Sequence, residues 1–415
     1  MINRIKSLNV FTKNIVIVFL GTSLANFFNL LYQLLIAHKL SASEFAAFNS
    51  LLSLFMIFSS PLGTIQMAIA KYSSEFNARN ELPKLKLLLS DFLQKASILA
   101  AVTFLIFWLS SRHIADILKI PAESCGYILA GMLALSWIAP LLLGAIQGME
   151  FFGWLSFGSV AAVGLKLALA FIFLLLGYSI AGALAAFLIA LLASIFIYYF
   201  PLRRFICFRA VKGDINYREI LTYLFPVALS NFCFISLVSM DMVLVKYFFS
   251  GQDPGLYSVA QMAGKIFLFL PGAISIVMFP RISGLDALKQ DTLSTLRRSL
   301  LYVLGLCFLA SIFYNLYPSL VLKALTGKVY PESILLGRLF SVSMTFFALL
   351  FIFISYFLPL KDFRFIKYLV SAAILQFLAI AFFHQNLIQI QAILCLSAIS
   401  LFFIHCFLAV FKKNL

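Results

Sequence analysis

The sequence predicts an all-α integral membrane protein with about 12 transmembrane helices, arranged as two parallel six-helix lobes around a central cavity. Composition is the first observation: the 415-residue chain is 63% hydrophobic and 11% charged, whereas soluble domains carry roughly 25% charged residues. The second is that apolar stretches of about 20 residues, long enough to cross a ~30 Å hydrocarbon core, recur along the whole chain. The third is an alternating distribution of basic residues between these stretches.

The apolar stretches define the helices in order. Amphipathic segments at 82–95 and 285–298 are expected to lie along the lipid surface before the third and ninth helices turn into the membrane. The helices are placed at about residues 14–38, 45–70, 88–110, 122–146, 152–176, 179–202, 219–249, 256–280, 297–322, 332–357, 364–383 and 387–411.

Lys and Arg are distributed unevenly between the two ends of these helices. Of the 31 basic residues, 22 lie in the tails and in alternate links, six in the opposite links and three inside helices. Because basic loops stay on the cytoplasmic side, both termini are predicted to be cytoplasmic and the helix number even. Membrane topology therefore explains the net charge of +16. Contacts to anionic membrane lipids are the alternative explanation, and a nucleic-acid partner is not predicted.

A weak internal repeat relates the two halves. At an offset of 209 residues Phe48 matches Tyr257, and Gly63 matches Gly272. Since the second half starts after six crossings, both halves have the same orientation, which favours a cavity between lobes. The predicted parts are an N-terminal six-helix lobe at 1–202, a cytoplasmic linker at 203–218 and a C-terminal six-helix lobe at 219–415.

Helix packing and bending leave short signatures. Gly144 and Gly148 form a G-x-x-x-G motif, which predicts close contact between two helices. Prolines inside helices remove a backbone hydrogen bond and permit bends, either static or used in transport. These prolines are Pro61, Pro140, Pro226 and Pro271.

Four ionisable residues lie inside predicted helices: Lys166, Asp241, Lys265 and Arg338. A charge at the centre of a membrane helix costs about 2.5–3.5 kcal/mol, so such residues usually face a wet cavity or a partner. The three cations are candidates for binding a diphosphate, and Asp241 for a coupling group or a charge pair with Lys265. In the structural alternative, Asp241 and Lys265 only neutralise each other and Arg338 extends toward the interface.

The first helix carries amides on one face. Asn26, Asn29 and Gln33 are spaced three and four residues apart, with Tyr32 beside them. Amides and aromatic rings suit sugar hydroxyls and sugar rings, so these residues are candidates for the glycan. Hydrogen bonding between helices is the alternative.

Several segments resemble a known family. Asp241 comes late in the seventh helix, and Gly255, Leu256, Tyr257 and Ala260 follow a short loop in a Gly-Leu-Tyr-x-x-Ala pattern. This hairpin resembles that of the polysaccharide flippases of the Wzx type, within the multidrug/oligosaccharidyl-lipid/polysaccharide exporter superfamily. Matches of the same kind are the segment 279–281 and the first hairpin, at 34–48, where the family usually has Gly in place of Ala46.

The resemblance implies a flippase without cofactors in a bacterial inner membrane. Its cargo would be an oligosaccharide on undecaprenyl diphosphate, moved by alternating access for O-antigen and lipopolysaccharide, capsule or exopolysaccharide synthesis. It leaves open H⁺ or Na⁺ coupling and an association with polysaccharide polymerase machinery.

Enzyme chemistry finds little support in the residues. The four histidines are isolated, and neither a Walker motif nor a paired-carboxylate pattern is present, so neither metal ligation nor direct ATP hydrolysis is predicted. Two other functions stay open: a cation-coupled multidrug antiporter, which a net positive cavity disfavours, and a membrane-embedded glycan polymerase or ligase, which would need longer outer loops.

Overall fold

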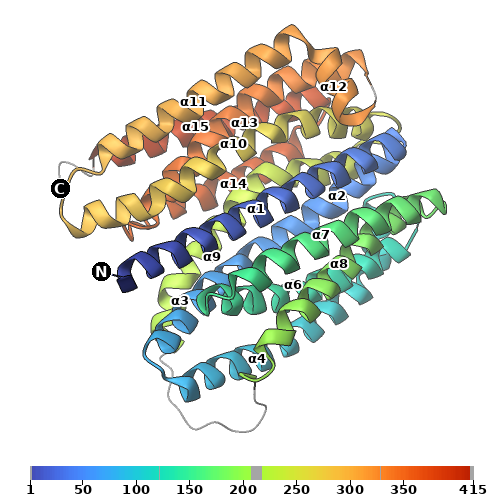
Figure 1. Ribbon diagram of the computed structural model, residues 1–415. Helices are drawn as coiled ribbons and strands as arrows, with labels where there is room; N and C mark the ends of the chain where they lie inside the picture. The colour runs from blue at the N-terminus through green and yellow to red at the C-terminus, as the bar shows by residue number, and fades with distance from the viewer. Residues whose placement is uncertain (1, 121, 207–216, 328, 412–415) are drawn as a thin grey trace. The chain divides into compact units, whose positions relative to one another are not determined.

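A computed structural model describes residues 2–120, 122–206, 217–327 and 329–411 (Figure 1). These residues form helices joined by short turns, and they contain no strand. Most of the predicted linker at 203–218 lies outside the described residues.

The helices follow in two series. The first is α1 (Ile2–Lys39), α2 (Ala42–Ser59), η1 (Ser60–Leu62), α3 (Gly63–Ala78), α4 (Leu82–Leu109), α5 (Ser111–Ile117), α6 (Ser124–Gly148), α7 (Phe152–Leu175) and α8 (Ser179–Leu202). The second is α9 (Tyr217–Phe248), α10 (Asp253–Ala287), α11 (Leu293–Leu316), α12 (Pro318–Thr326), α13 (Pro331–Phe357), α14 (Ile366–Phe382) and α15 (Leu387–Phe411).

The predicted all-α membrane class is confirmed. Within the described residues, 10 segments are helical, long and apolar enough to cross a membrane, and one of them, Ala42–Asn77, comprises α2, η1 and α3. The shorter apolar α14 and the 35-residue α10 lie where the other two predicted helices, 364–383 and 256–280, are placed.

Three predicted details need correction. Residues 82–95 belong to the unbroken α4, and 285–298 contain the end of α10 and the start of α11, so neither forms a separate surface helix. The predicted helix at 297–322 stops at Leu316, because Pro318 cannot donate the next backbone hydrogen bond and instead begins α12.

The chain divides into two compact units. Unit 1 comprises Met1–Leu40 and Phe58–Ala228, and unit 2 comprises Ser41–Ile57 and Leu229–Leu415. The segment Ser41–Ile57 belongs with unit 2 because it packs on α10. There Asn49 Nδ2 donates to Ser258 Oγ at 2.7 Å, and a Cβ added at Gly255 would lie only 2.8 Å from the Cβ of Ala42.

The internal repeat recurs in element order and in packing. In unit 1, α6 packs against α3, α4 and α8, and α7 against α8; in unit 2, α13 packs against α10, α11 and α15, and α14 against α15. The short helices α5 and α12 occupy the same place in the two series, each before the central helix of its unit. Each unit is therefore built on the same helix arrangement.

Close packing on α6 depends on the predicted glycine motif. A Cβ on Gly144 would lie 2.5 Å from the carbonyl oxygen of Gln66, and one on Gly148 would lie 2.3 Å from that of Ala70. Backbone atoms cannot move aside as a side chain can, so only glycine allows α3 to approach this closely. The motif is thus a packing motif, as predicted.

One of the predicted prolines interrupts an α-helical segment, and two others lie inside unbroken helices. Pro61 lies in η1, where the second apolar segment is interrupted by a 3₁₀ turn, and Pro140 and Pro226 lie inside α6 and α9.

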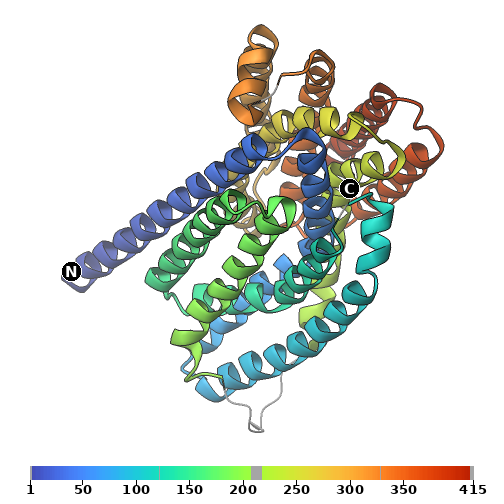
Figure 2. The same ribbon diagram turned by 90° about the vertical axis from the view of Figure 1, so that its right-hand side faces the viewer.

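In unit 1, α1 and α7 run side by side in both views (Figures 1 and 2).

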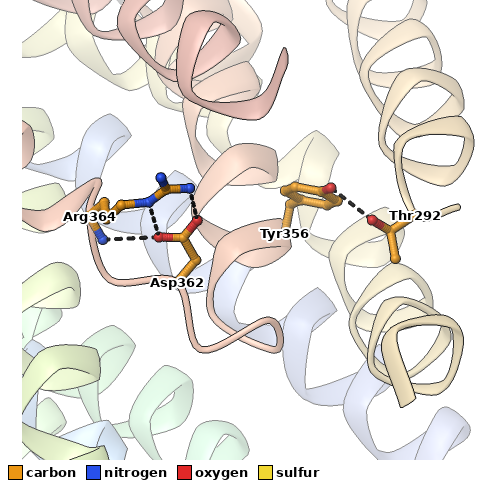
Figure 3. A network of polar contacts seen from close by, with 4 residues as sticks. All are labelled: Thr292, Tyr356, Asp362 and Arg364. Carbon is orange, nitrogen blue, oxygen red and sulfur yellow. Dashed lines mark hydrogen bonds and ion pairs between the residues drawn. The ribbon is translucent and has the colours of Figure 1, made fainter. Parts of the chain in front are cut away.

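The connection between α13 and α14 is fixed by polar contacts (Figure 3). Arg364 donates to both carboxylate oxygens of Asp362, at 2.9 and 2.8 Å, and Asp362 also accepts the backbone N–H of Arg364. Nearby, the hydroxyl groups of Tyr356 and Thr292 lie 2.8 Å apart, which ties the end of α13 to the start of α11.

Candidate functional site

A buried carboxylate lies at the centre of unit 2. Asp241, on α9, has no exposed surface. Its Oδ2 accepts hydrogen bonds from the hydroxyl of Tyr257 at 2.8 Å and from Nε2 of Gln261 at 2.9 Å, both on α10. Tyr257 and Gln261 are four residues apart, so one face of α10 presents both donors to α9.

The network extends to two more helices. The Tyr257 hydroxyl lies 3.5 Å from Oε1 of Gln391 on α15, and Gln391 Nε2 donates to Ser343 Oγ on α13 at 2.7 Å. Both Gln391 and Ser343 are fully buried. Four helices of one unit are therefore linked through a polar chain that ends at the carboxylate. We call Asp241, Tyr257, Gln261, Gln391 and Ser343 the unit 2 network.

Lys265 contributes to this network from a distance. It lies on α10 one turn beyond Gln261, and it interacts electrostatically with Asp241. Among the described residues Asp241 forms no direct ion pair, and its Oδ1 is buried without a hydrogen-bond partner. The direct contacts of Asp241 are thus neutral donors, and the charge pair with Lys265 stays a hypothesis supported by their electrostatic interaction. One carboxylate oxygen stays available to a proton or a cation.

A buried cation marks unit 1. Lys166, on α7, is 7% exposed, and its Nζ donates a short hydrogen bond to Oδ1 of Asn29 on α1. The same ammonium lies 4.3 Å from the ring centroid of Tyr32 and 4.8 Å from that of Phe187. Amide oxygen and aromatic faces both stabilise a cation without neutralising it. We call Lys166, Asn29, Tyr32 and Phe187 the unit 1 cation cage.

Of the amides predicted on the first helix, only Asn29 joins this cage. Asn26, one turn earlier on α1, is exposed, and Gln33 is half-buried. Tyr32, which lies between them in sequence, is buried and donates to the carbonyl oxygen of Ala183 on α8 at 2.9 Å. The amide face therefore divides into a packed part and an accessible part.

Arg338 lies on the surface of unit 2. Its side chain is exposed on α13, and it interacts electrostatically with Tyr314 on α11. The side chain of that tyrosine occupies the space beside the neighbouring Gly337, where its hydroxyl oxygen would lie 1.9 Å from an added Cβ. Unit 2 contains both Lys265 and Arg338, whereas Lys166 belongs to unit 1.

Three buried polar residues escaped the sequence reasoning. Gln261 and Gln391 complete the unit 2 network, and His405 is fully buried against Phe357 and Phe365, its Nδ1 2.7 Å from the carbonyl oxygen of Leu401. The spacing of Tyr257, Gln261 and Lys265 at four-residue intervals was a readable signal. Lone polar residues in apolar helices are a weaker one.

Comparison with known proteins places this geometry in a family. A family model described as polysaccharide biosynthesis protein matches residues 11–286. An uncharacterised membrane protein of Methanocaldococcus jannaschii, MJ1375, is 25% identical over 225 residues, which cover 49% of this chain and 51% of that protein. The match thus spans about half the length of this relative.

Solved structures share the fold across nearly the whole chain. An inward-facing multidrug resistance MATE family transporter of the MOP superfamily aligns with a TM-score of 0.73 and 14% identity, covering 94% of this chain and 96% of that one. The lipid II flippase MurJ in an inward closed conformation aligns with a TM-score of 0.71 and 13% identity, covering 95% and 87%. At these identities the likeness concerns the fold alone.

The fold and the ten apolar spans found among the described residues define a multi-pass membrane protein with the architecture of the MOP-superfamily transporters. Within that class, the chain belongs to the polysaccharide biosynthesis protein family, whose model covers well over half of it. The resemblance noted in the first and seventh hairpins is thereby confirmed.

Proposed function

We propose that this protein is a flippase for an oligosaccharide linked to undecaprenyl diphosphate. It moves the repeat unit across the bacterial inner membrane by alternating access, for O-antigen and lipopolysaccharide, capsule or exopolysaccharide synthesis. The observation that carries the proposal is membership of the polysaccharide biosynthesis protein family over residues 11–286. The transporter fold supports it, because a membrane protein of such a pathway with this fold is suited to moving cargo rather than to making it.

The charge of the described residues suits an anionic cargo. Among them, no acidic side chain forms an ion pair with Lys166, so no carboxylate neutralises the unit 1 cation cage. Lys265 and Arg338 add cationic groups on unit 2. We propose these three residues as diphosphate ligands, and Asn26, Asn29 and Gln33 as ligands of the sugars, used at successive stages of transport.

The unit 2 network is proposed as the coupling site. The unpartnered Oδ1 of Asp241 offers an oxygen to H⁺ or Na⁺, while two neutral donors hold the other oxygen. A bound cation would neutralise the negative charge of the network and weaken the electrostatic attraction between Asp241 and Lys265. Binding of the ion to one conformation more than to another would then drive the cycle.

Transport can be measured in proteoliposomes with a fluorescent polyprenyl-diphosphate oligosaccharide and a membrane-impermeant quencher. The wild-type protein should move probe from the inner leaflet to the outer leaflet, where the quencher reaches it. Lys166→Met keeps a side chain of similar volume and removes the charge, and it should reduce the transport rate at least tenfold at equal protein levels. Arg112→Ala serves as the matched control, since Arg112 is highly exposed outside the predicted helices. Unchanged transport by Lys166→Met, Lys265→Met and Arg338→Ala alike would contradict the cationic site.

A cation-coupled multidrug antiporter is the second candidate, favoured by the MATE transporters among the similar structures and by the carboxylate Asp241. The transported substrate distinguishes the two candidate functions. Export of a cationic dye that depends on Asp241, with no movement of the lipid-linked probe, would favour the antiporter.

A further inference from the structure

A groove runs along one face of the α1–α7 pair in unit 1, with a volume of about 640 Å³. Phe28, Leu31 and Leu35 line it from α1, and Gly164 and Phe171 line it from α7. All of its lining residues are apolar except His38, which lies at one end. The two helices run side by side here (Figure 2).

The extent of the groove matches one leaflet of a bilayer. The membrane span of α1 is Ile17–Lys39, so Phe28 lies at its middle and His38 at its end. Ten residues of helix from Phe28 to His38 rise about 15 Å, which is half of a ~30 Å hydrocarbon core. On α7 the lining likewise begins near mid-helix and continues toward its C-terminal end. A hydrocarbon chain entering from one surface would fill it and stop at the midplane.

A lysine follows the last lining residue of α1 at the end of the groove. His38 and the adjacent Lys39 are both exposed, and within the described residues neither side chain has an acidic partner. His38 Nδ1 lies 2.8 Å from the carbonyl oxygen of Leu34, so this nitrogen donates its proton to the helix backbone. A phosphate at this level would meet the Lys39 ammonium.

We propose that this groove binds one chain of an anionic phospholipid, whose phosphate contacts Lys39. The occupant follows from three matched properties: an apolar lining, a length of one leaflet and an exposed lysine next to the last lining residue of α1. The bound lipid belongs to the leaflet at the C-terminal end of α1, which the distribution of basic residues makes the outer one. It is separate from the unit 1 cation cage, because Lys166 does not line the groove.

Gly164 allows the groove to be closed by substitution. A Cβ at this position would lie 3.5 Å from the Phe28 ring, an ordinary contact, so a side chain can be added without a backbone clash. Gly164→Leu would place the rest of its side chain in the groove, and Ala168→Leu is a second filling variant on the same lining. Gly153→Leu is the control, since a Cβ there meets nothing within 4 Å and Gly153 does not line the groove.

The test is lipid retention by the purified full chain, measured by native mass spectrometry after delipidation and titration with dioleoyl phosphatidylglycerol or dioleoyl phosphatidylcholine. The wild type should retain one phosphatidylglycerol in preference to phosphatidylcholine. Both groove-filling variants should lower that affinity on the order of tenfold, whereas Gly153→Leu should not. Replacing Lys39 by alanine should lower it about fivefold for phosphatidylglycerol and leave phosphatidylcholine unchanged.

Unaltered retention in either filling variant, with a normal unfolding temperature, would overturn the proposal. So would equal retention of the two phospholipids by the wild type. Displacement of phosphatidylglycerol by an equimolar polyprenyl phosphate would assign the groove to the isoprenoid carrier instead, and would likewise overturn it. Because no cargo is present in this assay, its result is independent of whether the protein transports the lipid-linked oligosaccharide.

Discussion

At the residue scale, the unit 2 network shows how a carboxylate is kept inside a membrane helix. Asp241 is stabilised by a hydroxyl and an amide that donate to the same oxygen, and by a lysine at longer range. Hydrogen bonds to a charged acceptor contribute about 1.5–3 kcal/mol each, more than those between neutral groups. Tyr257 and Gln261 are therefore expected to matter more to folding than Lys265 does.

Tyr257→Phe removes one of the two donors and leaves the ring in place against Phe340, whose centroid is 5.0 Å away. We expect a loss of about 1–3 kcal/mol in the free energy of unfolding, because a buried carboxylate loses a partner. Combining it with Asp241→Asn should cost less than the sum of the two single changes. Denaturation in detergent measures this coupling, and additive effects would show that the hydrogen bond contributes nothing.

A second double-variant cycle tests the longer-range interaction. Asp241→Ala should impair transport and destabilise the protein, because Lys265 loses its counter-charge in a low-dielectric site. Adding Lys265→Ala should partly restore stability, with a coupling smaller than that of the Tyr257 cycle. The midpoint of thermal unfolding reports this, and a double variant as unstable as the two singles combined would mean that the residues do not interact.

The helix positions could be predicted from the sequence because hydropathy alone decides them. The partners of Asp241 could not, since the rotation of α9 against α10 decides whether Gln261 or Lys265 reaches the carboxylate. The same reason explains Arg338, which lies within a predicted helix while its side chain is exposed. The amide face of α1 was partly predictable, because the three-residue spacing shows that Asn26 and Asn29 share a side but not which of them meets α7.

At the element scale, α6 and α13 organise their units. Both pack against three other long helices, and 72% of the span in α13 is buried. The short helices α5 and α12 went unpredicted because seven and nine residues are too few for a periodic signal. The break at Pro318 was readable, since proline is favoured in the first turn of a helix.

Close approach of α3 to α6 predicts a strong effect at Gly148. Gly148→Ala places a methyl group 2.3 Å from the Ala70 carbonyl oxygen, so the helices must separate. Overpacking of this kind costs about 1–3 kcal/mol, and more where backbone is the obstacle. Thermal unfolding should show a clear decrease, whereas Gly153→Ala on α7 should show almost none. Equal stability of the two variants would mean that α3 and α6 are not in tight contact.

At the scale of the whole molecule, the distribution of basic residues sets the orientation. The division of 22 to six between the two sides predicts that both termini are cytoplasmic. The helix order repeats between the two series, with one short helix in each, which agrees with an even number of crossings.

A reporter active only in the periplasm, fused after Leu415, should be silent for this reason. The same reporter inserted after Gly177, in the short turn between α7 and α8, should be active, since that turn lies on the opposite side. Activity at Leu415 would indicate an odd number of crossings and would contradict the arrangement of six spans in each half.

The position of the donors to Asp241 has a consequence for biosynthesis. Tyr257 and Gln261 follow Asp241 by 16 and 20 residues, in the next helix to be made. At roughly 5–20 residues per second, α9 therefore leaves the ribosome about one to four seconds before its carboxylate can be satisfied. An acidic residue alone in a membrane helix opposes insertion, by about 2.5–3.5 kcal/mol at the helix centre and by less toward the end where Asp241 lies. We expect α9 to wait beside the translocon until α10 arrives, so that the two helices enter the lipid as a hairpin.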